Sequence, residues 1–123
     1  MHKVLVIDDD ALFRDSLATT LRRAGYAVTA CAHARDLAAL LATESFYAIV
    51  TDLYMPECDG IEVMQRVRRA SLGTRVIGIS GARLNIDSAC FRAIKALGAA
   101  GVLEKPLDSE ALLALLGEPP AAA

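Results

Sequence analysis

Cysteine is scarce in this 123-residue chain, and the three present are far apart in the sequence. Cys31, Cys58 and Cys90 form no C-x-x-C pair, and the chain has two histidines. Disulfide frameworks use even numbers of cysteines, and structural zinc sites use closely spaced Cys and His ligands, so the sequence predicts neither. The three thiols are expected to be reduced and to serve mainly in packing.

Long apolar runs are absent as well. The composition is 54% apolar and 23% charged, but no run approaches the roughly 18 residues of a membrane span. The segment after Met1, HKVLVIDDD, is too short for the core of a signal peptide, and it meets aspartates where a cleavage site would be needed. We therefore expect a globular, cytoplasmic protein with no membrane partner.

Neither sign of charge is in large excess. The formal net charge is −2, which gives no global attraction to the phosphate backbone of nucleic acids. Direct nucleic-acid binding by this chain is therefore disfavoured. The length is that of one ordinary domain, which can bury a core without disulfides or metal.

Apolar runs of strand length alternate five times with segments of helical spacing. The expected strands are KVLVID (3–8), YAVTAC (26–31), YAIVTD (47–52), RVIGIS (75–80) and GVLEK (101–105). Because parallel strands need long crossovers, the intervening helices must cover both faces of the sheet. The pattern predicts an α/β fold: a doubly wound five-stranded parallel sheet with five helices.

The ends of the expected helices also carry signals. Asp10 is placed to cap the first helix, Gly25 to end it, and Asp108 to cap the last one. The arginines in RVRR (66–69) are interpreted as a solvated helix end that the helix dipole favours.

Polar residues lie at the carboxyl ends of four of these strands. They are Asp8 and Asp9 at the first, Asp52 at the third, Ser80 at the fourth and Lys105 at the fifth. In the doubly wound order 2-1-3-4-5 the first and third strands are neighbours, and ligands bind at this edge. Three carboxylates at close range repel one another unless a cation is present, and Mg²⁺ prefers oxygen ligands.

This set of residues suits phosphoryl transfer to an aspartate. A metal held by carboxylates, the Lys105 ammonium and the Ser80 hydroxyl can together neutralise phosphoryl oxygens, while one carboxylate attacks phosphorus. Asp52 is the best candidate nucleophile because it ends its strand alone, between the acidic pair and Lys105.

Each residue taken alone has a simpler interpretation. The run at 8–10 could serve only as a helix cap, Asp52 as a turn residue, and Lys105-Pro106 as a strand terminus. Only the joint placement at one edge of the sheet is specific.

Four ordered motifs carry a resemblance to a known family. VLVIDDD, IVTDLYMPECDG, IGISGA and VLEKPL resemble the receiver domain of bacterial two-component response regulators, over essentially the whole chain. The resemblance implies a flavodoxin-like fold with strand order 2-1-3-4-5. It also implies that an aspartate accepts a phosphoryl group from a histidine kinase or histidine phosphotransfer protein, with Mg²⁺ as cofactor.

By position, the resemblance also assigns roles at the metal site. Asp52 corresponds to the phosphoacceptor and contributes to the metal shell. Asp9 corresponds to a direct metal ligand and Asp8 to a ligand through water, while the backbone carbonyl of Tyr54 completes the shell.

Further roles and two departures follow from the same comparison. Ser80 resembles the switch hydroxyl and Lys105 the lysine that pairs with the phosphoryl group, and the Lys105-Pro106 bond is expected to be cis. Val102 stands where receivers usually carry an aromatic switch residue. The segment from Gly81 to Leu97 is also a few residues longer than is typical.

The expected function is a signalling domain, at 1–117, followed by a disordered tail or linker start at 118–123. The domain would change conformation on phosphorylation and catalyse only its own phosphorylation and dephosphorylation, so it is not expected to be an enzyme on other substrates. The identity of the downstream partner or effector domain, and whether the chain forms a homodimer, are left open.

Two alternative functions also stay open: a Mg²⁺-dependent phosphohydrolase with an aspartyl-phosphate intermediate, and a phosphorylation-independent binding module. Tyr54, in place of a second acid two positions after Asp52, argues against the first.

Overall fold

The computed structural model describes residues 2–53, 60–70, 73–81 and 89–117. Five parallel strands form one sheet in the order β2-β1-β3-β4-β5, which confirms the predicted topology. The strands are β1 (Lys3–Ile7), β2 (Ala27–Cys31), β3 (Ala48–Asp52), β4 (Arg75–Ser80) and β5 (Gly101–Glu104). The helices are α1 (Ala11–Arg23), α2 (Leu37–Thr43, after a 3₁₀ turn at Ala34–Asp36), α3 (Gly60–Ala70), α4 (Ala89–Ala96) and α5 (Ser109–Leu116).

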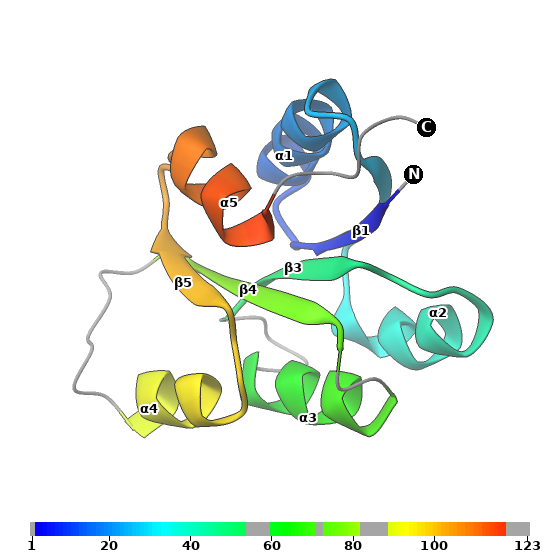
Figure 1. Ribbon diagram of the computed structural model, residues 1–123, viewed down its shortest axis with the longest axis vertical. Helices are drawn as coiled ribbons and strands as arrows, with labels where there is room; N and C mark the ends of the chain where they lie inside the picture. The colour runs from blue at the N-terminus through cyan, green and yellow to red at the C-terminus, as the bar shows by residue number, and fades with distance from the viewer. Residues whose placement is uncertain (1, 54–59, 71–72, 82–88, 118–123) are drawn as a thin grey trace.

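Helices cover both faces of the sheet. In Figure 1, α1 and α5 lie on one face and α2, α3 and α4 on the other. Successive side chains of β1 alternate between the two cores: Val4 and Val6 pack toward α1 and α5, whereas Leu5 and Ile7 pack toward the other three helices. This two-sided burial explains why the strands are continuous apolar runs. None of the described helices is long and apolar enough to cross a membrane.

The predicted helix caps are confirmed. The Asp10 side chain accepts hydrogen bonds from the backbone amides of Leu12 and Phe13, at 3.1 and 3.3 Å. Gly25 follows the end of α1 with a φ of 101°, a conformation that glycine adopts without steric cost. Asp108 caps α5 in the same way as Asp10 caps α1. The β1–α1 and β5–α5 connections, which carry three of the predicted site residues, therefore end in defined geometry.

The interpretation of the α3 arginines as solvated is wrong for Arg68. Its guanidinium donates hydrogen bonds to the carbonyls of Leu97 and Gly98, both at 3.0 Å, and of Thr74 at 2.7 Å. Leu97 and Gly98 directly follow α4, where helix carbonyls lack intrahelical donors. The planar guanidinium of Arg68 has several donors and can satisfy these carbonyls at once. Its hydrogen bonds connect α3 to the α4–β5 connection.

Three side chains fix the C-terminal end of α5 on the sheet. Tyr26 and Tyr47 directly precede β2 and β3, and Arg75 is the first residue of β4. Tyr26 donates to the Gly117 carbonyl at 2.7 Å, Tyr47 donates to the Leu116 carbonyl, and Arg75 donates to the same carbonyl at 3.4 Å. Burial raises the pKa of Tyr26, so its hydroxyl stays protonated and able to donate at neutral pH. The cap at one end of α5 and these contacts at the other fix the segment that follows Lys105.

Gly78 in β4 provides a test of how tightly the sheet packs. A Cβ at this position would lie 2.7 Å from Cδ2 of Leu53, which is buried. Gly78→Ala should therefore lower the free energy of unfolding by about 1–3 kcal/mol, the usual cost of overpacking, as measured by urea denaturation. Gly73→Ala is the control, because no atom lies within 4 Å of a Cβ there. Equal stability of the two variants would contradict the packing described here.

Candidate functional site

Three predicted carboxylates come together at the carboxyl edge of the sheet. Parallel pairing of β1 with β3 aligns Ile7 with Thr51, so the residues that follow, Asp8 and Asp52, are neighbours. Both are buried, with exposed fractions of 1% and 7%, whereas Asp9 is exposed. One carboxylate oxygen from each of Asp8, Asp9 and Asp52 lies within 4.8 Å of the others.

Asp8 has one satisfied oxygen and one that lacks a hydrogen bond. Its Oδ1 accepts from the Asp10 backbone amide at 2.8 Å. Its Oδ2 is buried and receives no hydrogen bond, although the Lys105 Nζ lies 3.1 Å away as an ion-pair partner. A buried oxygen of this kind needs an explanation, and a hard divalent cation shared with two further carboxylates provides one. The donor set therefore fits a divalent metal ion.

Lys105 reaches the same cluster from the end of β5. Its Nζ lies 3.1 Å from Asp8 Oδ2 and 3.8 Å from Asp52 Oδ2, and its side chain is 22% exposed. The Lys105-Pro106 peptide is cis, as expected. The structure thus places a single ammonium group within ion-pair distance of both buried carboxylates.

Ser80 ends β4 next to the strand that leads to Lys105. It is 1% exposed, and its carbonyl accepts a hydrogen bond from the Lys105 backbone amide at 2.8 Å. Val102 pairs in register with Gly78 and packs against the core under α2, α3 and α4. Tyr54, the predicted carbonyl ligand, lies outside the described residues, as does much of the longer segment, at 82–88.

Two residues beside the site are not predicted from the sequence. Arg14, in the first turn and a half of α1, donates from Nη1 to the Asp8 carbonyl at 2.8 Å, which holds the backbone of the acidic loop. The Phe13 ring lies under the Lys105 ammonium, with 4.2 Å between Nζ and the ring centroid. The sequence does contain a signal for Arg14. A cation near a helix N-terminus interacts unfavourably with the helix dipole, so an arginine there indicates a specific contact.

Cys31 lies at the end of β2, close to the acidic loop but outside the cluster. Its carbonyl accepts from the Asp8 amide at 3.2 Å. Burial, and to a lesser extent the negative charge of Asp36, raise the pKa of the Cys31 thiol. The thiol therefore stays protonated at neutral pH, which fits the packing role expected for it. The side chains of Cys58 and Cys90 lie outside the described part of the chain.

The family model of the response regulator receiver domain matches residues 4–117. The chain belongs to this family. Among curated relatives, the transcriptional regulatory protein FixJ of Bradyrhizobium diazoefficiens is 34% identical over 92% of this chain and 54% of its own length. The response regulator protein FleR of Pseudomonas aeruginosa is 33% identical over 93% of this chain and 24% of its own length. The receiver chain thus spans about half, or less, of these relatives.

Solved structures share the same fold. A response regulator from Burkholderia pseudomallei, determined with a phosphorylated aspartic acid, a calcium ion and citrate, superposes with a TM-score of 0.84. It is 28% identical, over 95% of this chain and 67% of that one. The chemotaxis response regulator CheY4 of Vibrio cholerae gives a TM-score of 0.83 at 32% identity, over 94% of this chain and 96% of that one. Both agree with the flavodoxin-like architecture of the receiver.

The acidic cluster predicts that divalent cations stabilise the fold. A ligand that binds only the native state adds about 2.7 kcal/mol at a concentration 100 times its Kd, so Mg²⁺ or Ca²⁺ should raise the melting temperature in a saturable way. Asp9→Asn removes one charged ligand. The variant should therefore need at least about ten times more cation to reach the same rise in melting temperature. The matched control is Asp15→Asn, an exposed α1 residue outside the cluster. An identical cation dependence for both variants would exclude Asp9 as a ligand.

Proposed function

We propose that this receiver accepts a phosphoryl group on Asp52 from a histidine kinase or histidine phosphotransfer protein, in a Mg²⁺-dependent reaction. One observation carries the proposal. Asp52 is held at the end of a buried strand with its carboxylate oxygen within 4.8 Å of oxygens of Asp8 and Asp9, and 3.8 Å from the Lys105 ammonium. A nucleophile beside a metal-binding carboxylate pair and a cation is the arrangement that phosphoryl transfer requires.

In the proposed reaction an Asp52 oxygen attacks the phosphorus of a phosphohistidine. An O–P bond forms as the N–P bond breaks, and the electron pair returns to the imidazole nitrogen of the donor. Asp8, Asp9 and Asp52 would hold a Mg²⁺ ion, together with the backbone carbonyl of Tyr54, and the ion would supply positive charge to the phosphoryl oxygens.

Lys105 and Ser80 act on the phosphoryl group during its transfer and after it. The Lys105 ammonium exchanges its carboxylate partners for a phosphoryl oxygen, and the Ser80 hydroxyl donates to another. These moves link the chemistry to the backbone of β4 and β5, because the Ser80 carbonyl and the Lys105 amide share a hydrogen bond. Water then hydrolyses the acyl phosphate and restores the carboxylate, so the domain catalyses only its own modification and resets itself.

The setting of this chemistry is part of the proposal. We place the receiver at residues 1–117 and expect it to work in the cytoplasm, with a kinase or phosphotransfer protein upstream. FixJ is a transcriptional regulatory protein and is longer than this chain, so an output domain or a separate partner would read the phosphorylated state. The phosphorylated aspartic acid in the Burkholderia pseudomallei regulator supports the same chemistry here.

Intact-protein mass spectrometry after incubation with acetyl phosphate tests the proposal. We expect a single phosphoryl adduct that forms with Mg²⁺, fails to form with EDTA, and is absent in Asp52→Asn. The variant keeps the shape of the side chain but removes the nucleophilic oxygen. Asp15→Asn controls for the general loss of one carboxylate and should label like the wild type.

Wild-type labelling of Asp52→Asn would refute the assignment of the phosphoacceptor. If the wild type gains no adduct and also fails to bind beryllium fluoride with Mg²⁺, the domain is a phosphorylation-independent binding module. Turnover of many phosphomonoester molecules per protein would instead indicate a phosphohydrolase.

A further inference from the structure

The Lys105 ammonium has a third partner besides its two carboxylates. Its Nζ lies over the face of the Phe13 ring, 4.2 Å from the centroid, well inside the roughly 6 Å range of cation–π attraction. We propose that Phe13 is a positioning residue for Lys105: its ring holds the ammonium at the mouth of the site while Asp52 is phosphorylated. This inference rests on the proposed function, and it assigns a role to a residue that touches none of the reacting atoms.

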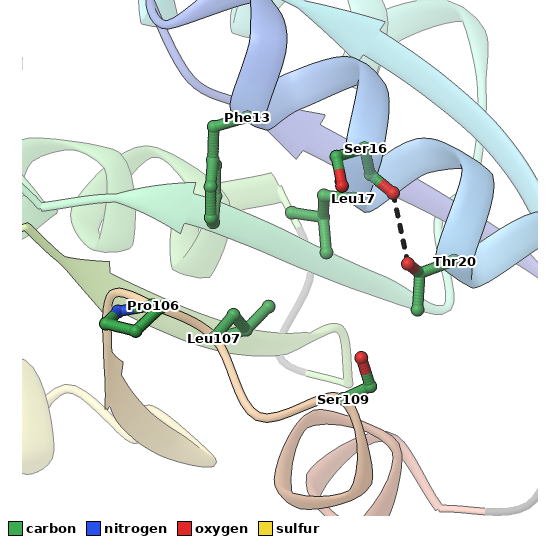
Figure 2. A pocket seen from close by; sticks show the side chains of 7 residues that line it. All are labelled: Phe13, Ser16, Leu17, Thr20, Pro106, Leu107 and Ser109. Atoms are coloured by element: carbon green, nitrogen blue, oxygen red, sulfur yellow. Dashed lines mark hydrogen bonds between the residues drawn. The ribbon is translucent and has the colours of Figure 1, made fainter.

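The ring itself is fixed in place. Phe13 is half-buried on α1, and its backbone amide donates to the Asp10 cap at 3.3 Å, so the first turn of the helix sets its position. Figure 2 shows the side chain pointing from α1 toward the Pro106–Leu107 segment that follows Lys105. There it lines a cavity of about 250 Å³ together with Leu17, Pro106 and Leu107. The ring thus lies between α1 and the β5–α5 connection.

The contact matters because the other partners of Lys105 change during the reaction. Asp8 and Asp52 attract the ammonium at 3.1 and 3.8 Å. A divalent cation at these carboxylates would neutralise them and repel the ammonium. The lysine side chain has four rotatable bonds and is 22% exposed, so it could then turn into solvent.

The Phe13 ring is the partner that a metal does not neutralise. Its attraction comes from the quadrupole of the π-system, which does not depend on the charge of the carboxylates. An ammonium kept over the ring remains close to the position where the phosphoryl oxygens would arrive. Pre-positioning of this kind lowers the entropic cost of reaching the transition state.

A series of fluorinated phenylalanines at position 13 separates this attraction from simple packing. One, two and three fluorine atoms weaken the quadrupole stepwise while the ring keeps its shape. We expect the rate of phosphorylation by acetyl phosphate, at saturating Mg²⁺, to fall stepwise, by about two- to fivefold over the series. The same substitutions at Phe46 are the matched control, because this ring is buried in the other core and should leave the rate unchanged.

The outcomes distinguish this inference from the proposed function. If the wild type is labelled on Asp52 but the rate is flat or rises across the Phe13 series, Phe13 has only a packing role and the proposed function stands. If the wild type is never labelled, both proposals fail. A parallel decline at Phe46 would show a general effect of fluorine on the fold and would also overturn the assignment of Phe13.

Discussion

The pairing of β1 with β3 is the constraint on which the site depends. Its register places Asp8 beside Asp52 at one edge of the sheet. A slip by one residue would turn every side chain of the strand to the opposite face. Both strands are buried on two faces, by cores that differ in their members, so such a slip would disrupt both cores at once. Apolar packing therefore fixes the position of the charges.

The first turns of α1 serve the site in several ways at once. Asp10 caps the helix, Arg14 holds the carbonyl of Asp8, and Phe13 lies under the Lys105 ammonium. Lys105 in turn belongs to the segment between β5 and α5. Hydrogen bonds from Tyr26 and Tyr47 fix the far end of α5 to the sheet. The acidic loop and the lysine are thus held by two helices on the same face. Their relative position follows from how α1 and α5 pack.

Local signals account for what could be predicted from the sequence. Apolar runs gave the five strands, and single capping residues such as Asp10 and Asp108 gave the helix starts, because each signal is contained within a few neighbouring residues. Strand order then implied the convergence of Asp8, Asp9 and Asp52. The prediction fails for Arg68 because its acceptors, such as Thr74 and Leu97, lie in connections beyond the end of α3. The contact of Phe13 with Lys105 was missed for the same reason: it joins α1 to the end of β5, and neither residue alone indicates the other.

The most direct measurement of the central proposal is to locate the modified residue chemically. After phosphorylation by acetyl phosphate with Mg²⁺, reduction with borohydride converts an aspartyl phosphate to homoserine, which peptide mass spectrometry can place in the sequence. We expect homoserine at position 52 and unmodified aspartate at Asp8 and Asp9, since Asp52 is the proposed nucleophile and the other two are proposed metal ligands. Homoserine at position 8 or 9, with Asp52 intact, would contradict this division of roles.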